Sequence, residues 1–411
     1  MKKLLIFSEE YLKITKGMFL VWTNQVCETA KTRHVDVLLN NEHWAVNELG
    51  ESLRANARIT VYKLPFDMPS TWLRRTLPWR HRVFVLRVIT FVLGQTLDFA
   101  FSPLIVFFLF LLLRRLAPGA VFSHTGGWPA GALCRWIIYA AKVARVPKRI
   151  LVIHSHPEKD KFALSSTALA PLRFARAWLI GKCATSIVAV SDSVKVALET
   201  EVFSRPVIRV YNGIDLSTPD PRSMLRTGPL DWHPSGLTVG FVGALYPMKG
   251  PHVLLDAFRM VDIPCELALL GPNPPLPDYL KLLHERARLC ENNVSFIGYH
   301  DDVDGFLEKI DVLVVPSIAF ESFGMVILEA MKHKKPVICS DFGGMKEVVE
   351  NGVTGLVVSA GSASELTKAI VTLLADPSVR RQMGQAGYRR LSERFTSRIM
   401  AAQYDELVFD H

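Results

Sequence analysis

Two glutamates in the second half of the chain have a setting suited to binding phosphate and sugar. Glu321 and Glu329 lie in the segment FESFGMVILEA (320–330), directly after an apolar strand predicted over 312–316. We predict that a helix starts near Gly324, where unpaired amides and the helix dipole attract phosphate oxygens. Glu321 could accept hydrogen bonds from sugar hydroxyls, and Glu329 from a ribose diol. The alternative is a surface helix with two ordinary glutamates. The binding interpretation therefore depends on the position of both residues after a buried strand.

Lys249 has a similar position after the strand predicted over 238–242. That strand ends at Gly243, a short loop follows, and Lys249 and Gly250 open a helix. A lysine on a glycine-flanked loop can neutralise a diphosphate, although a solvent-exposed lysine at a helix start would look the same. The loop lacks the Walker spacing, which excludes a nucleotide-hydrolysing P-loop.

A third motif, DFGGMKE (341–347), follows the strand predicted over 336–340. Its two glycines could shape a wall of the binding site or form only a tight turn.

The elements that must position these residues are short apolar strands separated by helix-length segments. The expected strands are 3–7, 35–39, 59–64, 120–123, 150–154, 187–190 and 208–211 in the first half, and 238–242, 266–270, 294–298, 312–316, 336–340 and 355–358 in the second. This alternation is typical of parallel sheets covered by helices on both faces. We therefore predict an α/β chain with two Rossmann-like doubly wound domains. Ligands of such sheets bind at the carboxyl ends of the strands.

The predicted domain boundaries follow from this alternation. The N-terminal domain spans 1–215, and a linker rich in Pro, Ser, Thr and Gly spans 216–236. The C-terminal domain spans 237–394. The remaining 395–411 form a helix that could pack back on the N-terminal domain.

Charge is distributed very unevenly along the chain. Residues 1–200 hold 27 lysines and arginines against 13 acids, a net charge of +14, whereas the rest holds 21 and 26, a net −5. Between Pro69 and Pro157 the only acid is Asp98. The twelve basic residues of that segment are Arg74, Arg75, Arg80, Arg82, Arg87, Arg114, Arg115, Arg135, Lys142, Arg145, Lys148 and Arg149.

The same segment contains an apolar run of 15 residues, FAFSPLIVFFLFLLL (99–113), which ends at Arg114 and Arg115. A transmembrane helix needs about 20 apolar residues, so this run is short for a span. A basic, aromatic and aliphatic segment favours contact with the surface of an anionic membrane. A buried helix with ordinary surface arginines is the main alternative.

Other classes of protein are excluded. With 49% hydrophobic and 21% charged residues and a mean hydropathy of +0.21, the chain is not disordered. It has no nucleic-acid-binding motif. Its six cysteines form no CxxC pair, which favours buried thiols in a reducing cytoplasm over disulfides or a metal site. The apolar stretch 4–7 is too short for a signal peptide.

The second half resembles the retaining glycosyltransferases of family 4, which have the GT-B fold. The resemblance rests on FVGALYPMKG, LALLGPNP, VSFIGYHDDV, DVLVVPSIAFESFGMVILEAM and DFGGMKEVVENGVTGLVV, in this order between residues 239 and 358. It extends more weakly into IVAVSDSVK and VIRVYNGID. The resemblance implies that two domains close over a nucleotide sugar and that the C-terminal domain binds this donor.

The resemblance also implies roles for single residues of the second half. Glu321 contacts the transferred sugar, and Lys249 faces the diphosphate. The backbone from Phe323 through Gly324 to Met325 holds sugar and pyrophosphate. Glu329 binds the ribose, Tyr299 lies near the base, and Gly243 belongs to the donor-binding set. Many members of the family have an arginine where this chain has Ala244.

In the first half, the resemblance assigns Gly17 to a loop that approaches the donor phosphates, with Lys16 in place of the family's first glycine. His154, after the predicted strand 150–154, matches a histidine near the transferred sugar. We expect His154 to act in catalysis with Glu321 and Lys249. His124 and His156 are weaker candidates on the same wall, with His124 on the acceptor side.

From these observations we predict a hexosyltransferase that retains the anomeric configuration and uses a UDP- or GDP-sugar. No metal or other cofactor is expected, because helix amides and Lys249 would neutralise the phosphates. The basic segment suggests a lipid-linked glycan acceptor at the cytoplasmic face of the membrane, in polysaccharide, lipopolysaccharide or O-antigen assembly. The alternatives are a sugar-nucleotide 2-epimerase, a soluble glycogen- or sucrose-type synthase, and a catalytically inactive scaffold. An NAD oxidoreductase is disfavoured, since no GxGxxG follows the first strand.

Overall fold

The computed structural model describes residues 3–8, 16–39, 56–64, 84–128, 131–157, 170–216, 228–319 and 321–409. The chain forms two compact units. Unit 1 comprises Met1–Val190, Val194–Val210 and Ala401–His411, and unit 2 comprises Ser191–Ser193 and Tyr211–Met400. Most of the predicted linker, residues 217–227, lies outside the described residues.

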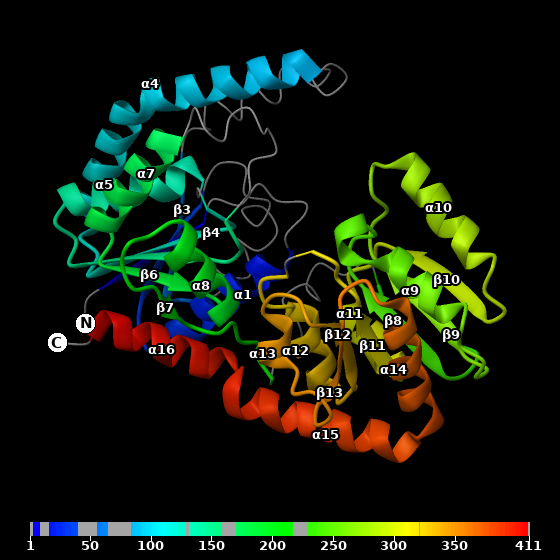
Figure 1. Cartoon of the computed structure of the whole chain (residues 1–411). Coiled ribbons are helices and arrows are strands. Elements are labelled where there is room, and N and C mark those ends of the chain that lie inside the picture. Colours follow the sequence, from blue (N-terminus) through cyan, green and yellow to red (C-terminus); the bar gives the residue numbers. More distant parts are fainter. Residues whose placement is uncertain are drawn as a thin grey trace. The chain divides into compact units, whose positions relative to one another are not determined.

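Unit 1 contains a seven-stranded parallel sheet in the order β3-β2-β1-β4-β5-β6-β7 (Figure 1). Its strands are β1 (Leu4–Ser8), β2 (Val35–Leu39), β3 (Ile59–Lys63), β4 (Ala120–Thr125), β5 (Lys148–Ile153), β6 (Ser186–Ala189) and β7 (Ile208–Arg209). The apolar residues of β1 and β2 are buried, as expected for strands covered on both faces.

Helices cover both faces of this sheet. They are α1 (Lys16–Ala30), α4 (Phe84–Leu116), α5 (Ala132–Val143), α7 (Ala170–Cys183), α8 (Asp192–Glu201) and α16 (Ser397–Phe409). In Figure 1, α4, α5 and α7 lie on one side of the sheet and α16 on the other. α5 packs between α4 and strands β4 and β5.

Unit 2 contains a six-stranded parallel sheet in the order β10-β9-β8-β11-β12-β13. Its strands are β8 (Thr238–Val242), β9 (Glu266–Leu270), β10 (Asn293–Gly298), β11 (Val312–Val315), β12 (Val337–Ser340) and β13 (Gly355–Val358). Its helices are η3 (Pro247–Lys249), α9 (Pro251–Phe258), α10 (Pro277–Ala287), α11 (Val303–Lys309), α12 (Met325–Lys332), α13 (Met345–Val348), α14 (Ala363–Ala375) and α15 (Pro377–Arg394).

Local sequence signals explain where several helices of unit 2 begin. The Asp302 carboxylate accepts a hydrogen bond from the Gly305 amide at the start of α11 (3.1 Å). Asp376 does the same for the Ser378 amide at the start of α15 (2.7 Å). Such side-chain caps satisfy amides that have no partner inside the helix.

Both doubly wound sheets confirm the predicted fold class, and every expected strand is present within two residues of its predicted bounds. In each sheet the strand order reverses once, between β1 and β4 in unit 1 and between β8 and β11 in unit 2. These reversals matter because ligands of doubly wound sheets bind beside them, at the carboxyl ends of the strands.

The apolar run 99–113 forms only part of a helix, and this helix is longer than the 15 residues of the run. α4 extends over 33 residues and contains Pro103. In the described part of the chain, no helix meets the length and hydropathy that crossing a membrane requires.

Candidate active site

Lys249 and Glu321 meet at the strand reversal of unit 2. Lys249 ends the short helix η3 after β8, and Glu321 lies on the loop after β11, the strand that pairs with β8. The Lys249 ammonium donates a hydrogen bond to the Glu321 carboxylate in a close ion pair. Their side chains are 37% and 20% exposed, so both groups remain accessible to a ligand.

The loop that carries Lys249 depends on Gly250. This residue has a φ of 71°, a left-handed conformation that side chains rarely adopt. A Cβ atom at Gly250 would lie 1.9 Å from the carbonyl oxygen of Pro316, at the end of β11. The Ile318 amide also donates to the carbonyl of Met248 (3.0 Å). The loops after β8 and β11 are therefore in direct backbone contact.

The glycine pair of the DFGGMKE motif packs against the Glu321 loop. The Gly344 amide donates to the Glu321 carbonyl (2.8 Å). A Cβ atom on Gly343 would lie 2.1 Å from that carbonyl oxygen, and one on Gly344 would lie 2.2 Å from the Ser322 oxygen. Of the two interpretations that the sequence left open, the contacts favour a role in shaping the site.

The helix predicted near Gly324 is α12, which begins at Met325 with Gly324 as its N-cap, at φ 81°. The Phe323 ring is 2% exposed and packs between Tyr211 and Phe395, with ring centroids 5.8 and 5.9 Å away. Phe323 thus anchors the loop through its side chain. Glu329 lies in the middle of α12 and is 7% exposed.

The remaining donor-site candidates of unit 2 lie at neighbouring strand ends. Gly243 follows β8, and Gly271 follows β9. A Cβ atom added to Gly271 would lie 1.9 Å from the carbonyl oxygen of Gly243, so the two strand ends are in close contact. Tyr299 follows β10, is 50% exposed, and donates to the carboxylate of Asp301. Ala244 follows Gly243 directly, so no cation is present at that position.

In unit 1 the structure brings two of the predicted histidines together. His124 is on β4 and His154 directly follows β5, and Nδ1 of His124 lies 2.9 Å from Nε2 of His154. One ring must donate and the other accept, so at least one is neutral. Burial lowers the pKa of His154 to about 3. Burial and then the neighbouring ring lower the pKa of His124 well below its usual value.

The other first-half candidates are less informative. Gly17 lies in the first turn of α1 rather than on a loop, since the helix begins at Lys16. The preceding residues 9–15 lie outside the described part of the chain. His156 is next to Pro157, whose carbonyl oxygen lies 3.2 Å from its Nδ1.

Glu347 was not predicted as a site residue. Its carboxylate accepts hydrogen bonds from the amides of Asp192 (2.7 Å) and Ser193 (2.8 Å) and from the Ser193 hydroxyl (2.5 Å). All three residues belong to unit 2. Its place at the end of DFGGMKE was the only signal in the sequence.

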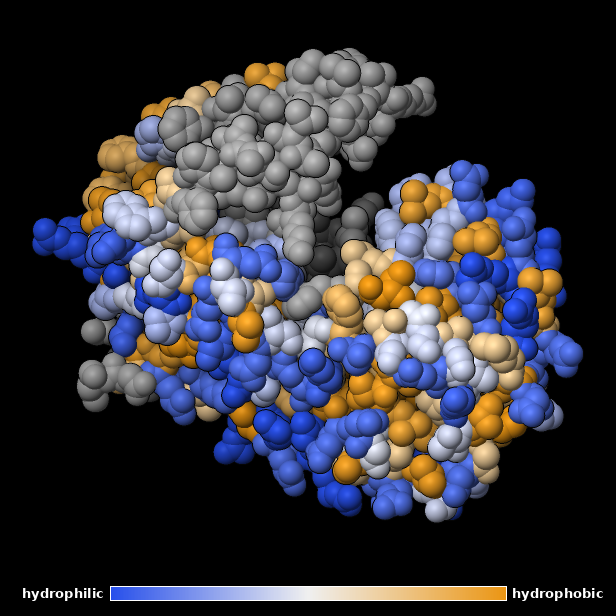
Figure 2. Space-filling model, viewed as in Figure 1, coloured by the Kyte–Doolittle hydropathy of each residue, from blue (hydrophilic) through white to orange (hydrophobic). Residues whose placement is uncertain are grey.

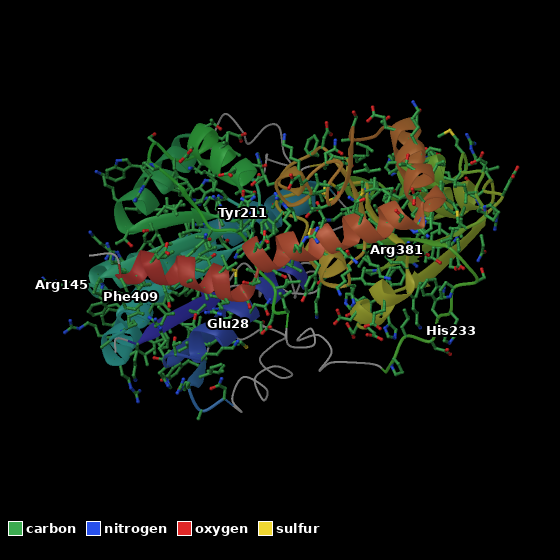
Figure 3. The ribbon with its side chains drawn as sticks, turned by 90° about the horizontal axis from the view of Figure 1, so that it is seen from below. Glu28, Arg145, Tyr211, His233, Arg381 and Phe409 are labelled. Carbon is green, nitrogen blue, oxygen red and sulfur yellow. The ribbon has the colours of Figure 1, made fainter. Side chains whose placement is uncertain are left out.

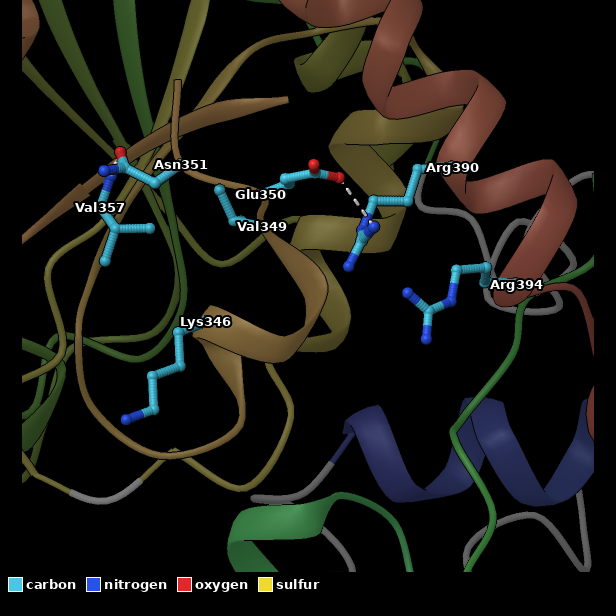
Figure 4. Close-up of a pocket in the computed structure, with 7 residues that line it drawn as sticks. All are labelled: Lys346, Val349, Glu350, Asn351, Val357, Arg390 and Arg394. Carbon is cyan, nitrogen blue, oxygen red and sulfur yellow. Dashed lines mark hydrogen bonds and ion pairs between the residues drawn. The ribbon is translucent and has the colours of Figure 1, made fainter. Parts of the chain in front are cut away.

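A separate depression of about 680 Å³ lies between α13, β13 and α15 (Figure 4). It is lined by Lys346, Val349, Glu350, Asn351, Val357, Arg390 and Arg394 and by none of the predicted site residues. Arg390 donates to the carbonyls of Val348 (2.8 Å) and Glu347 (3.0 Å) and pairs with Glu350. These contacts tie α15 to the end of α13, which indicates a structural role. Within the described residues, no group of three His, Cys, Asp or Glu side chains is placed to hold a metal ion.

Comparison with known families agrees with this geometry. Residues 231–390 match the model of glycosyl transferases group 1, and residues 43–218 match the model of Glycosyltransferase Family 4. The chain belongs to glycosyltransferase family 4. Its two parallel-sheet α/β units are those of the GT-B fold.

Individual curated proteins are similar to this chain over part of its length. The phosphatidyl-myo-inositol mannosyltransferase of Mycobacterium leprae is 29% identical over 274 residues, 65% of this chain and 68% of that protein. A capsular polysaccharide biosynthesis glycosyltransferase of Staphylococcus aureus is 28% identical over 244 residues, which are 55% of this chain and 61% of that protein. Other curated relatives are matched over only 38% to 55% of their own length.

Among solved structures, Anabaena HepE in complex with UDP has a TM-score of 0.71, with 24% identity and both chains covered in full. At this identity the likeness establishes the fold.

The Gly250 contact gives a stability prediction with an internal control. Gly250→Ala should lower the free energy of unfolding by about 2 kcal/mol or more, because a left-handed alanine also collides with the Pro316 carbonyl. Gly352 has a similar φ of 78°, but a Cβ atom there would meet no atom within 4 Å, so Gly352→Ala should cost only about 1 kcal/mol. Urea unfolding measures both. An equal loss of unfolding free energy in the two variants would contradict the close contact between Gly250 and the Pro316 carbonyl.

The buried histidines predict acid sensitivity. Both pKa values are depressed in the folded chain, so their stabilising effect is complete above pH 6.5 and is lost as the pH falls towards the folded values. For His154 the loss between pH 6.5 and pH 5 is about 2 kcal/mol. Urea unfolding at several pH values should show this loss, and a chain with His124→Gln and His154→Gln should show a flatter profile.

The matched control is His233→Gln, since His233 is 80% exposed on its side chain and labelled at the edge of the molecule in Figure 3. This variant should keep the pH dependence of the wild type. A wild-type profile that the paired histidine substitutions leave unchanged would show that the buried pair does not cause the acid sensitivity.

Proposed function

We propose that this chain is a retaining glycosyltransferase that moves a hexosyl unit from a UDP- or GDP-sugar to a lipid-linked glycan acceptor. The observation that carries the proposal is the ion pair of Lys249 and Glu321 at the β8–β11 reversal, beside the start of α12. The cation and the helix amides at this place suit the negatively charged diphosphate of a nucleoside-diphosphate sugar. The carboxylate suits the hydroxyls of its sugar and ribose.

Each group has a role that its chemistry suits. The Lys249 ammonium would leave Glu321 for the diphosphate and take up the charge that grows as the nucleoside diphosphate departs. The freed Glu321 carboxylate would accept hydrogen bonds from sugar hydroxyls. The backbone from Phe323 to Met325 would hold the pyrophosphate, where Gly324 lets it approach closely.

The nucleoside would lie along the neighbouring strand ends. Glu329 would bind the ribose diol and Tyr299 would lie near the base. Gly243 would allow the phosphates close to the end of β8, and Gly17 would have the phosphate-binding role that the family resemblance implies.

In the reaction, the bond from the anomeric carbon to the phosphate oxygen breaks and a bond to the acceptor oxygen forms on the same face. The acceptor proton passes to the departing phosphate oxygen. His154 would contact the transferred sugar through Nδ1, because its Nε2 is bonded to His124. Nδ1 is buried and has no hydrogen-bond partner among the described residues.

The acceptor and the location follow from the basic first half. A surface rich in Lys and Arg would hold the chain at an anionic membrane, at the cytoplasmic face where lipid-linked sugars are extended. Two similar proteins, a phosphatidyl-myo-inositol mannosyltransferase and a capsular polysaccharide biosynthesis glycosyltransferase, support a lipid-linked acceptor and a role in cell-surface polysaccharide synthesis. Arg74, Arg75, Arg80 and Arg82 lie outside the described residues.

Donor use is the first test. In a thermal-shift screen, UDP- or GDP-sugars should raise the melting temperature of the full chain, and Glu321→Ala should lower turnover roughly 100-fold or more while the fold is kept. Glu285→Ala, on the exposed face of α10, is the matched control and should keep full activity. Wild-type turnover in Glu321→Ala would overturn the site. Conversion of the donor sugar to an epimer without an acceptor would identify an epimerase instead.

Metal dependence is the second test. Because Lys249 and helix amides would neutralise the diphosphate, EDTA should leave turnover unchanged, and Lys249→Gln should lower it strongly. The comparison is made at saturating donor, so that the loss reports on the leaving group as well as on binding. Turnover that EDTA abolishes and Mg²⁺ restores would contradict this mechanism.

A further inference from the structure

Six large apolar side chains are exposed along the described part of α4. Leu93 is 44% exposed, and the other five lie close together between residues 101 and 111, spaced as the members of one broad helix face are. The exposed fractions are 47% for Phe101, 67% for Leu104, 59% for Phe107, 37% for Phe108 and 51% for Leu111.

The other side of α4 is apolar as well. Ile105, Leu109 and Leu113 are buried, at 8%, 1% and 1% exposed, where the helix packs on α5. A helix on the surface of a water-soluble domain normally has a polar outer face. α4 needs its inner stripe to fold onto α5, but nothing in the described part of unit 1 needs its outer stripe to be apolar.

The exposed apolar surface continues onto the neighbouring helices. Val143 at the end of α5 is 61% exposed, and Trp178 and Leu179 on α7 are 65% and 42% exposed. α5 packs against both α4 and α7. Figure 2 shows hydrophobic residues gathered at the upper left, where Figure 1 has these helices. We refer to the exposed side of α4, α5 and α7 as the three-helix face.

The charges of the three-helix face have one sign. The sequences of α4, α5 and α7 hold eight lysines and arginines and a single acid, Asp98. Of the basic residues whose side chains the structure describes, four are exposed: Arg114 and Arg115 at the end of α4, Lys142 at the end of α5, and Lys182 on α7. Exposed bases beside exposed aromatic and aliphatic residues match the headgroup and acyl layers of an anionic bilayer.

We propose that the three-helix face inserts into the interface of an anionic phospholipid membrane, with α4 lying in the membrane plane. The exposed stripe of α4 would enter the acyl region, and Arg114 and Arg115 would bind lipid phosphates. This inference deepens the proposed function, since it names the surface through which the chain would reach a lipid-linked acceptor.

Charge also distinguishes the bilayer from a second copy of the chain. In a two-fold dimer each patch meets its own copy, so the basic residues of the two copies would lie close together. Like charges at an interface are unfavourable, and these three helices contain only one acid that could compensate. Anionic headgroups provide the missing negative charge.

Vesicle flotation with the full chain tests the inference. The wild type should float with vesicles that contain phosphatidylglycerol and much less with pure phosphatidylcholine. A chain with Leu104→Gln, Phe107→Gln and Leu111→Gln should bind at least about 10-fold more weakly, since three apolar side chains no longer enter the acyl region. Arg114→Gln with Arg115→Gln should weaken binding roughly 30-fold at low salt, and high salt should reduce that difference.

The matched control replaces three exposed apolar residues of unit 2. Met260→Gln, Leu276→Gln and Leu289→Gln change side chains that are 48%, 41% and 60% exposed and should leave flotation unchanged. Flotation of the α4 variant at the wild-type level would overturn the inference. So would a dimer that the α4 variant converts to a monomer in light scattering while vesicle binding is kept.

Donor thermal shifts measured on the same proteins separate the two proposals. A chain that floats but responds to no nucleotide sugar would refute the proposed function and leave the membrane face standing. A chain that responds to a nucleotide sugar but ignores anionic vesicles would refute the membrane face alone.

Discussion

The ion pair between Lys249 and Glu321 depends on one feature of the topology, the adjacency of β8 and β11. These strands are separated by two further strands in sequence, but they pair in the sheet, so the loops after them leave side by side. Gly250 permits one of these loops to touch the other, and Gly343 permits α13 to approach Glu321. A side chain at either glycine would push the loops apart and separate the two charges.

The pair also explains how the site tolerates its own charges without a ligand. Glu321 is 20% exposed, and a partly desolvated carboxylate without a partner is costly. Lys249 compensates this carboxylate in the free chain. A nucleotide-sugar donor would replace this pairing with two new ones. The lysine would pair with the diphosphate, and the carboxylate would pair with sugar hydroxyls. The site can therefore bind a charged group without leaving either side chain unpaired in either state.

Much of this arrangement could be predicted from the sequence because it depends on local signals. Apolar runs give the strands, and the residues just after β8 and β11 give Lys249 and Glu321, since parallel strands present their carboxyl ends at one edge. The direct side-chain pairings of His124 with His154 and of Glu347 with Ser193 could not be predicted, although His124 and His154 were expected on the same wall. His124 and His154 are 30 residues apart, and Glu347 is 154 residues from Ser193. Their pairing depends on how neighbouring elements pack, which no local pattern records.

The length of α4 shows a different limit. A proline inside a helix removes a hydrogen bond and costs roughly 3 kcal/mol, so Pro103 is unfavourable within α4. The packing of Ile105, Leu109 and Leu113 on α5 offsets this cost, so the helix continues through it. Tertiary packing therefore creates the long, continuous outer stripe. The net charge of +14 in the first 200 residues belongs with that stripe, because the predicted diphosphate site lies in the half whose net charge is −5. In this chain, bulk charge would determine where the protein is held, whereas one lysine and a few amides would determine what it binds.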